Sequence, residues 1–557
     1  MYYKKKMEES ITAAGDKGKF QKIITRVGIR LGSLPFILSI SYAYLTKMPK
    51  FLCKDENGQF TIPCEYDRAT FCSSENPIEF IKDKKNSVDN FTYAFDLYCS
   101  KEFFTPIFST LFFFGGLMGS VIFAPIPDKY GRKTIFQFIQ ILSFILQLNV
   151  LFAVGPWHLA FTFFFSGLTT YGFGMSSIIV AEYLPRNISN IIMSIENGSF
   201  PLVGIIIGIF FCFINNMKLL FVITFLIQTT TTYLTLKYFK ESPIWLFSMK
   251  LKERFVQTMR EISVINDREA QFEDWYKNNK DYLNKLMAKN PKDKNDDNDE
   301  EIKTYNLKEI FSFNSQRNNL IKTFFSFFMI GCVFYGIILN LAYAKGSFYI
   351  TCFCSFSGEI SGELSSGVLA GIIGRVKVLY LGCFLSGICM VIYTLMDSIG
   401  LNYICIYLAT LGIASSFNVL FIYTPELYPT PIRGTVCGYS FLLSRFGAMV
   451  VSPVTSIFGV FTTNILFACC SIGSAIIISK MPETLGKELQ NEIPEFEGMD
   501  ALIDSTKSKL YSNKRFLISE KLFKSSFIGH DPLTIQQISS KSIGQFSNIG
   551  SGIFSRK

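Results

Sequence analysis

The sequence has few charged residues for its length. Only 18% of its 557 residues are Asp, Glu, Lys or Arg, and the stretch from Thr134 to Ala181 contains none of them. A soluble chain of this length would divide into several domains with a more highly charged surface. The scarcity of charge therefore excludes an ordinary soluble protein and predicts an α-helical protein that crosses a membrane many times.

Residues that carry enzymatic chemistry are also scarce. The chain has two histidines, His158 and His530, and it has no Cys/His cluster with metal-ligand spacing, no phosphate-binding loop and no hydrolase elbow. We therefore expect no enzymatic activity, no metal and no cofactor, and we expect that ATP bound to this chain does not drive its function. No cleavable signal peptide is expected, because a polar stretch follows Lys4, Lys5 and Lys6.

The apolar residues fall into long runs. Hydrophobic residues make up 49% of the chain, and their runs predict twelve helices of about 20 residues, enough to cross ~30 Å of hydrocarbon at ~1.5 Å per residue. We expect these spans at 28–46, 104–126, 134–154, 157–181, 190–214, 219–238, 322–344, 349–373, 377–396, 401–424, 434–458 and 461–479.

Basic residues at the ends of the runs indicate an orientation. The connections after spans 3, 9 and 11 have no Lys or Arg, whereas those after spans 2, 4, 8 and 10 carry Lys129, Arg132, Lys133, Arg186, Arg375, Lys377 and Arg433. By the positive-inside rule, both termini lie in the cytoplasm. This placement accounts for the net charge of +10 without a nucleic-acid partner.

The expected domains follow from two long connections. They are a cytoplasmic N-terminus (1–26), an N-terminal six-helix half (27–239), a cytoplasmic linker (240–320), a C-terminal six-helix half (321–480) and a mostly disordered cytoplasmic tail (481–557). The linker is expected to form amphipathic helices, such as 252–288, and then a disordered polar tract.

The other long connection, 47–103, is expected outside the cell or in a lumen. Its four cysteines, Cys53, Cys64, Cys72 and Cys99, suggest two disulfides in an oxidising compartment, with three possible pairings. Asn90 begins an N-glycosylation sequon, Asn-Phe-Thr, on the same side.

Short motifs recur at matching places in the two halves. "APIPDKYGRK" after span 2 corresponds to "AGIIGRVK" after span 8, "EYLPR" after span 4 corresponds to "PELYPTPIR" after span 10, and "ESPIWL" after span 6 corresponds to "PETLGKEL" after span 12. Each motif alone is weak evidence, but six motifs in register indicate two six-helix repeats.

This pattern resembles the major facilitator superfamily over about residues 18–490. The resemblance implies an all-α membrane fold of twelve transmembrane helices in two six-helix repeats, and a latch of charged pairs on the cytoplasmic side. The structural alternative is that these charges only enforce topology. The expected latch residues are Asp128, Gly131, Arg132, Lys133, Glu182, Arg186, Glu241, Glu426, Arg433 and Glu483.

Within that superfamily, the sequence is similar to the organic cation, anion and carnitine transporter family. The cysteine-rich first loop, its ending "FDLYC", the Gly-x-Phe-Gln element at Gly18–Gln21 and "FYGIILN" in span 7 carry this resemblance. Sugar porters share several of the motifs, but their span-7 Gln-Gln-x-x-Gly-x-Asn pattern is missing. Ile244 stands where the family has Arg, and Ser365 stands where it has Pro.

Polar residues inside the spans are the candidates for substrate binding. Arg445 lies about 11 residues into span 11, near the membrane midplane, and a charge there must pair or face a water-filled cavity. It is expected to bind a carboxylate, with pairing to an acid of span 8 and snorkelling to lipid as the alternatives. The expected substrate-binding residues are Arg445, Glu363, Tyr335, Tyr171 and Asn340.

Two further acids lie inside predicted spans, and for Glu359 the alternative is a place at the membrane interface. Glu359 lies one helical turn before Glu363, and Glu196 is an intramembrane charge of span 5 for which the resemblance offers no counterpart.

Three functions remain open from the sequence. The first is a secondary transporter of small organic ions, anionic or zwitterionic, which works by alternating access as a monomer in the plasma membrane or an intracellular vesicle membrane, with a coupling ion or counter-substrate as a further partner. The second is a sugar or polyol porter. The third, from another class, is a nutrient sensor that does not transport.

Overall fold

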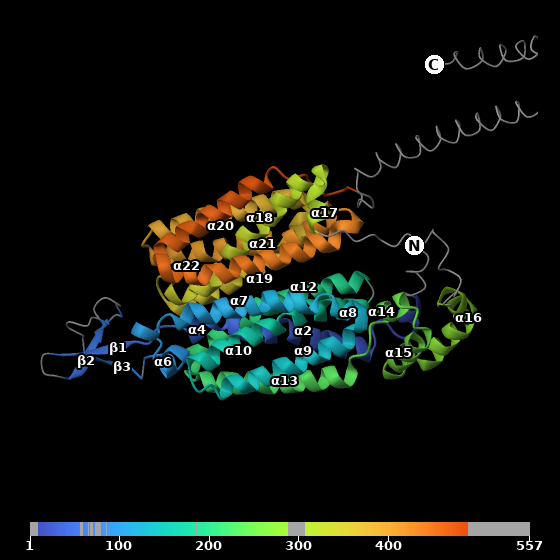
Figure 1. Ribbon diagram of the computed structural model, residues 1–557. Helices are drawn as coiled ribbons and strands as arrows, with labels where there is room; N and C mark the ends of the chain where they lie inside the picture. The colour runs from blue at the N-terminus through green and yellow to red at the C-terminus, as the bar shows by residue number, and fades with distance from the viewer. Residues whose placement is uncertain are drawn as a thin grey trace, which may run out of the picture. The chain divides into compact units, whose positions relative to one another are not determined.

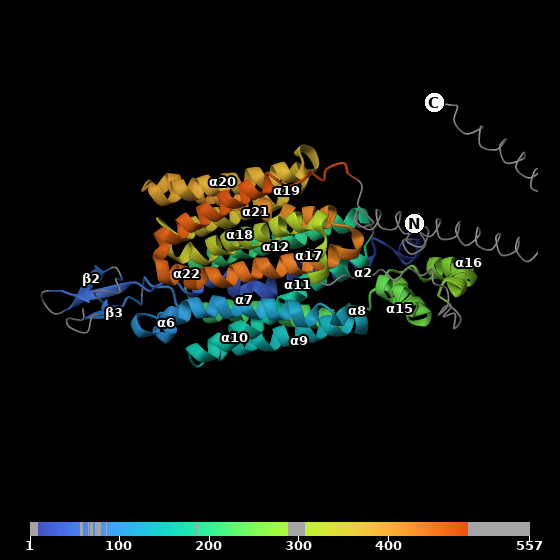
Figure 2. The ribbon, with the colours of Figure 1, turned by 45° about the horizontal axis from the view of Figure 1, so that its top comes forward.

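The computed structural model describes residues 9–487, except 56–58, 65, 67–70, 73–78, 85, 185 and 288–306. The expected polar tract of the linker and the expected tail beyond Lys487 lie outside the described residues. The described part is mostly helical, as the composition predicts, and Figures 1 and 2 show its long helices running side by side in two adjacent bundles.

The first bundle is the N-terminal half. Its helices are α2 (Lys19–Ser33), α3 (Ile37–Ile40), α4 (Tyr42–Leu45), α7 (Phe104–Phe123), α8 (Ile126–Tyr130), α9 (Arg132–Leu151), α10 (Pro156–Thr169), α11 (Tyr171–Glu182), α12 (Arg186–Phe213) and α13 (Met217–Tyr238). The second bundle holds α18 (Asn314–Asn340), α19 (Phe348–Ile373), α20 (Arg375–Leu395), α21 (Ile399–Leu427) and α22 (Thr430–Ile478).

Ten stretches among the described residues are long and apolar enough to cross a membrane. The last of them, Pro431–Ile478, has 48 residues, about 72 Å of helix and so more than two bilayer thicknesses. It bends at Gly459, where φ is 76° and ψ is 168°, between the expected spans 11 and 12. The 26-residue α19 is long enough to span, but its glycines, serines and two glutamates lower its hydropathy. The arrangement therefore agrees with the twelve expected crossings.

Two spans are interrupted near their middle. The first begins at Lys19, nine residues earlier than expected, and α2 gives way to a 3₁₀ turn, η1 (Leu34–Phe36), around Pro35. The fourth is divided into α10 and α11 at Thr170, where 3₁₀-type bonds run from the Thr170 N–H to Gly167 and from the Phe173 N–H to Thr170. Irregular backbone at membrane depth is tolerated where it is buried in protein or lines a cavity.

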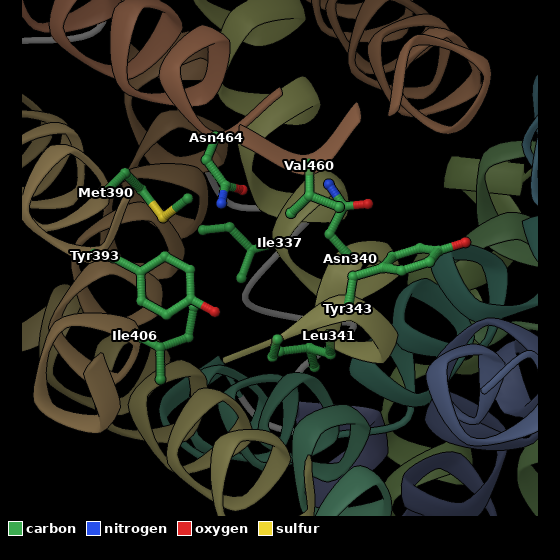
Figure 3. Close-up of a pocket in the computed structure, with 10 residues that line it drawn as sticks. Ile337, Asn340, Leu341, Tyr343, Met390, Tyr393, Ile406, Val460 and Asn464 are labelled. Atoms are coloured by element: carbon green, nitrogen blue, oxygen red, sulfur yellow. The ribbon is translucent and has the colours of Figure 1, made fainter. Parts of the chain in front are cut away.

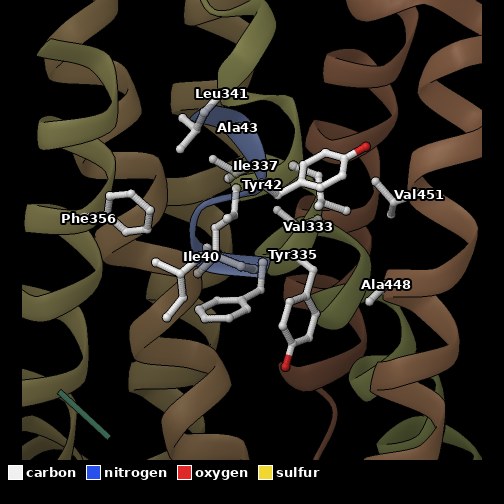
Figure 4. Packing of buried hydrophobic residues seen from close by; sticks show 14 of the residues in the cluster. Ile40, Tyr42, Ala43, Val333, Tyr335, Ile337, Leu341, Phe356, Ala448 and Val451 are labelled. Carbon is white, nitrogen blue, oxygen red and sulfur yellow. The ribbon is translucent and has the colours of Figure 1, made fainter. Parts of the chain in front are cut away.

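The two halves meet along two helix pairs, α7 with α22 and α12 with α19. Apolar side chains fill the contact near the first span, where Figure 4 shows Ile40 and Tyr42 close to Val333, Ile337 and other residues of α18. Within the halves, the helices approach closely where residues are small: a Cβ on Gly331 of α18 would lie 2.6 Å from the Ser444 carbonyl oxygen of α22. Such small-residue contacts are typical of membrane helices.

A small domain lies at one end of the helices, which we call the outer side (Figure 1). It contains an antiparallel sheet in the order β2-β1-β3, formed by β1 (Phe51–Lys54), β2 (Phe60–Cys64) and β3 (Phe80–Lys82), and the short helix α6 (Phe91–Phe95). This sheet was not predicted from the sequence. Its centre is Phe51, which is 1% exposed and packs against the rings of Phe71, Phe80 and Tyr98.

The outer cysteines form two disulfides, and of the three possible pairings the structure has Cys53–Cys64 and Cys72–Cys99. The first bond joins β1 to β2, and the second joins the segment between β2 and β3 to the start of the second span. Disulfides on this side agree with the expected oxidising compartment.

Asn90, the predicted glycosylation site, lies inside the outer domain. It is completely buried as the N-cap of α6, its Oδ1 accepts from the Tyr93 N–H, and its Nδ2 donates to the carbonyl oxygens of Tyr44 and Lys47 at 2.9 and 2.8 Å. The amide nitrogen that would carry a glycan is thus engaged within the fold, and glycosylation of Asn90 stays a prediction. Capping residues of this kind stabilise a helix by about 1 kcal/mol.

The other end of the helices, the inner side, carries the linker helices α14 (Pro243–Ser248), α15 (Lys252–Ile265), α16 (Glu269–Met287) and α17 (Leu307–Ser312). The predicted amphipathic segment 252–288 is thus two helices. Asn266, at the end of α15, accepts from the Phe20 N–H at 2.8 Å and donates to Gln21 at 3.0 Å. The linker therefore holds the Gly-x-Phe-Gln element, which caps and begins α2 at the start of the first span.

Candidate functional site

At the inner side of the N-terminal half, the motif residues form one polar cluster. Arg132 pairs with Glu182, and the Ser242 hydroxyl donates to the same carboxylate at 2.5 Å. Glu241 accepts from the backbone N–H groups of Arg132 and Lys133 at 2.8 and 3.2 Å. A carboxylate at a helix N-terminus is favourable because the unpaired N–H groups there carry partial positive charge.

The C-terminal half repeats this cluster residue by residue. Arg375 grips Glu426 with two hydrogen bonds of 3.0 and 2.9 Å, and Thr484 donates to that carboxylate at 2.7 Å. Glu483 accepts from the N–H groups of Arg375 and Val376 at 2.9 and 3.1 Å. Burial alone would raise the pKa of Glu483, but these backbone donors hold its pKa below the ordinary value.

The two clusters each lie within one half, so the described pairs brace the helices of a half and do not join the halves. Gly131 and Gly374 are part of the clusters, with φ of 100° and 105° at the starts of α9 and α20. Arg433 donates instead to the Tyr428 carbonyl oxygen at 3.2 Å. The side chains of Asp128 and Arg186 lie outside the described residues. A cytoplasmic latch remains a prediction.

Between the halves lies a central cavity of about 300 Å³. Aromatic side chains make up most of its wall: Phe36, Phe173, Phe200, Phe334, Tyr335, Phe417, Phe421 and Phe441. Polar groups stand at separate points of this wall: Ser177, Asn197, Glu363, Asn418 and Arg445. The lining comes from α11, α12 and the first span on one side and from α18, α19, α21 and α22 on the other, so both halves contribute.

Arg445 is the cation of this cavity. It is 2% exposed, and its Nη1 donates to the Thr170 hydroxyl at 3.2 Å, across the boundary between the halves. Its guanidinium carbon lies 5.2 Å from the ring centre of Phe36 and 5.1 Å from that of Phe441, within the range of cation–π attraction. Both interrupted spans therefore meet at Arg445, since Phe36 belongs to η1 and Thr170 divides α10 from α11.

No ion pair joins Arg445 to Glu363 in the part of the chain that the structure describes. The Arg445 Nε atom is buried without a hydrogen-bond partner there, and so is one carboxylate oxygen of Glu363. Glu363 is placed by its helix, because Asn418 of α21 donates to its backbone oxygen at 3.2 Å. The cavity thus contains a guanidinium and a carboxylate that do not form hydrogen bonds with each other.

Two more acids lie close to this cavity but do not line it. Glu196, completely buried on α12, accepts from the Ser176 hydroxyl at 2.8 Å, while its second oxygen has no partner among the described residues. Glu359 is 1% exposed, and neither of its oxygens has a described partner. Uncompensated carboxylates at this depth are costly, which makes them functional candidates.

Of the five residues predicted to bind substrate, the structure brings Arg445, Glu363 and Tyr335 to the central cavity. Tyr171 does not line it and instead packs near Phe123, with 6.2 Å between the ring centres. Asn340 lies at the outer end of α18, where it lines two other cavities. Tyr171 and Asn340 thus do not line the central cavity, and a role for them in substrate binding stays a prediction.

The polar groups that surround Arg445 and the cavity were not predicted from the sequence. Thr170, Asn197 and Asn418 are uncharged residues inside predicted spans, and no motif distinguishes them from the other polar residues there. Phe36 had a usable signal, because Pro35 inside a predicted span marks a break in the helix.

Comparisons with known proteins agree with this architecture. The sequence profile of the Major Facilitator Superfamily matches residues 100–453, more than half of the chain. Solute carrier family 22 member 16 of Xenopus laevis is 24% identical over 449 residues, which are 79% of this chain and 76% of that protein. Organic cation/carnitine transporter 4 of Arabidopsis thaliana is 23% identical over 71% of this chain and 74% of its own length.

The fold also matches solved structures. The xylose transporter XylE of E. coli, in an inward-open conformation, superposes with a TM-score of 0.54 over 84% of this chain and 97% of that one, at 13% sequence identity. At this identity the likeness shows the fold alone.

Proposed function

The chain belongs to the Major Facilitator Superfamily, and from this membership we propose that it is a secondary transporter of small organic ions that works by alternating access. It is a multi-pass integral membrane protein of a transporter family, and we place it in the plasma membrane. Its similarity to organic cation/carnitine transporters supports organic ions as the substrate class. A coupling ion or a counter-substrate would supply the driving force.

The observation that carries the proposal is the buried guanidinium of Arg445 with its unsatisfied Nε atom. A guanidinium is planar and suits bidentate binding of a carboxylate. Thr170, Phe36 and Phe441 hold it in place from three sides. We therefore assign the anionic end of the substrate to Arg445.

The rest of the cavity supports a zwitterionic or amphipathic solute. Glu363 provides a carboxylate for a cationic group, and the aromatic wall offers apolar burial and cation–π contact. A volume of about 300 Å³ is at the lower end of the range for small-molecule sites, so a compact solute fits.

Alternating access is supported by where the cavity lies. Its two walls belong to different halves, and Arg445 of the C-terminal half bonds to Thr170 of the N-terminal half. Rocking of one half against the other breaks that bond and exposes the site to the opposite side. The braced inner clusters keep each half rigid during the motion.

Uptake by the full chain in proteoliposomes tests the proposal. We expect Arg445→Ala to abolish uptake of carnitine and of monocarboxylates. Arg445→Lys should keep only part of this uptake, because an ammonium has the positive charge but lacks the planar pair of N–H donors. Arg254→Ala, on the exposed face of α15, is the matched control and should transport normally.

Surface expression and thermal stability must be measured alongside. Unchanged carnitine and monocarboxylate uptake in a well-expressed Arg445→Ala protein would refute the substrate role. Inhibition by hexoses, with no effect of organic ions, would favour a sugar porter, and ligand binding without any flux would favour a sensor.

A further inference from the structure

Glu359 of α19 is a buried acid that the proposed binding of the solute does not use. It is 1% exposed, and neither of its carboxylate oxygens has a hydrogen-bond partner among the described residues. It does not line the central cavity. It does not line the two outer cavities either, the smaller of which Figure 3 shows with Asn340 and Tyr393 in its wall. A negative charge on Glu359 would therefore have no compensation from a described side chain.

Three charged or titratable groups lie near Glu359 on the side of the central cavity. Glu363 follows one helical turn later on α19 and lines the cavity. Tyr335 of α18 is within electrostatic reach of both glutamates and of Arg445 on α22. In the described part of the chain, Arg445 forms no ion pair with either glutamate and donates instead to the Thr170 hydroxyl. The two acids thus lie side by side without a cation between them.

The titratable side chains of the other elements packed against α19 lie against groups other than Glu359. They are Glu196 of α12, Tyr44 and Lys47 of the first span, Tyr407 of α21 and Arg375 of α20. Among the described residues, Glu363 is the group whose charge acts on Glu359. The state of one glutamate therefore depends on the charge of the other.

Two ionised carboxylates are unfavourable in these surroundings. A buried charge without a partner loses its hydration, and like charges repel more strongly where the dielectric constant is low. Glu363 is only half-buried and faces the cavity, so it carries the negative charge of the pair. Glu359 is then neutral, with a proton on one of its oxygens.

An organic cation changes this balance. When the positive group of a solute lies on Glu363, it cancels the negative charge that opposes ionisation of Glu359. Glu359 can then ionise, and its proton passes to water in the central cavity. The linkage is reciprocal, so a proton on Glu359 weakens binding of the cation.

We propose that Glu359 is a proton-binding site, and that its proton is exchanged for the organic cation or zwitterion that Glu363 binds. The exchange rests on the proposed function, whereas the proton on Glu359 does not. Since the pair returns to the other side with either the solute or the proton, uptake of one solute exports about one proton.

Infrared spectroscopy of the full chain in nanodiscs tests the proton on Glu359 without any solute. A protonated carboxyl group has a carbonyl stretch that a carboxylate lacks, so Glu359→Gln should lose one such band at pH 7. Glu363→Gln should keep this band, and so should Glu253→Gln, an exposed acid of α15 that serves as the matched control. If Glu359→Gln loses no band, the proposal is overturned. A metal cation on Glu359 would give that same result, because it requires the ionised carboxylate.

Calorimetry counts the protons that leave when a solute binds. Tetraethylammonium, titrated in two buffers of different ionisation enthalpy, should release about one proton per bound cation. Its affinity should rise about tenfold from pH 6 to pH 7. Both effects should vanish in Glu359→Gln and persist in Glu253→Gln.

Two results of this titration would overturn the exchange: binding without proton release, or release that persists in Glu359→Gln. If tetraethylammonium does not bind at all, the substrate class of the proposed function is wrong. The infrared band then still decides whether Glu359 holds a proton, so failure of the two proposals is distinguishable.

Discussion

At the scale of single residues, Arg445 shows how a costly buried charge is accommodated. Thr170 supplies one hydrogen bond, and the faces of Phe36 and Phe441 supply cation–π contact in place of a counter-ion. The two interruptions of regular helix, at η1 and Thr170, bring these partners to the guanidinium. Glu363 does not pair with Arg445, which is what the proposed binding of a zwitterion by the two charges requires.

Gly116 of α7 is the neighbour that leaves room for this arrangement. A Cβ at Gly116 would lie 2.9 Å from the Arg445 Nη1 atom and 3.2 Å from the Thr170 hydroxyl oxygen. We expect Gly116→Ala to displace the guanidinium and to raise KM for carboxylated solutes several-fold, with little change in stability, because the end of an arginine is flexible. The KM is obtained by measuring uptake over a range of solute concentrations.

The matched control is Gly367→Ala on α19, where a Cβ meets nothing within 4 Å. It should leave KM unchanged. If the two variants shift KM equally, crowding of Arg445 is not the cause.

At the scale of elements, α9 and α20 begin in the same way, after a glycine that packs against a glutamate carboxylate. Gly131 and Gly374 have φ of 100° and 105°, and a Cβ on either would lie 2.5 Å from a carboxylate oxygen, of Glu241 or Glu483. The backbone conformation alone costs other residues about 1–3 kcal/mol. The motif therefore needs glycine for space and for backbone geometry together.

Because the two clusters repeat, we expect Gly131→Ala and Gly374→Ala to lower thermal stability by similar amounts. Each displaces the carboxylate that caps its helix, so the loss is the backbone cost plus weakened N–H bonds. The melting temperature of each detergent-solubilised variant measures this loss of stability. Gly434→Ala, on the same inner side with no atom near its Cβ, should melt like the parent chain. A loss confined to one half would contradict the equivalence of the repeats.

At the scale of the whole molecule, most of the architecture was predictable, because charge-poor runs and repeated motifs report on the bilayer directly. The pairing of Arg132 with Glu182 and the existence of two disulfides followed from residue type and placement. The outer sheet could not be predicted, because its strands have three to five residues each and are too short to show a clear alternating pattern. The sequence could not show that Tyr171 and Asn340 lie outside the central cavity, because a motif gives a position along a helix, whereas the cavity depends on which face packs against a neighbour.

The last prediction concerns how the halves close on the outer side. Lys47, just after the first span, lies 3.9 Å from the ring centre of Phe348 and 5.3 Å from that of Tyr349, both on α19 of the other half. Burial lowers the pKa of Lys47 from 10.5 to about 8. Opening the outer side exposes Lys47 and restores its ordinary pKa, so the closed arrangement binds fewer protons. Raising the pH from 7 to 9 should therefore favour closure, whereas changes below pH 7 should have little effect.

A cysteine at Leu339 measures this opening. Leu339 is 3% exposed and lines a cavity between the halves on the outer side, so the thiol of Leu339→Cys becomes accessible when that side opens. The reference is Val154→Cys, since Val154 is 86% exposed in the outer connection after α9. Labelling of Leu339→Cys by a neutral thiol reagent, relative to Val154→Cys at each pH, should fall as the pH rises. Lys47→Met should abolish the fall, and a fall that persists in that variant would show that another group controls closure.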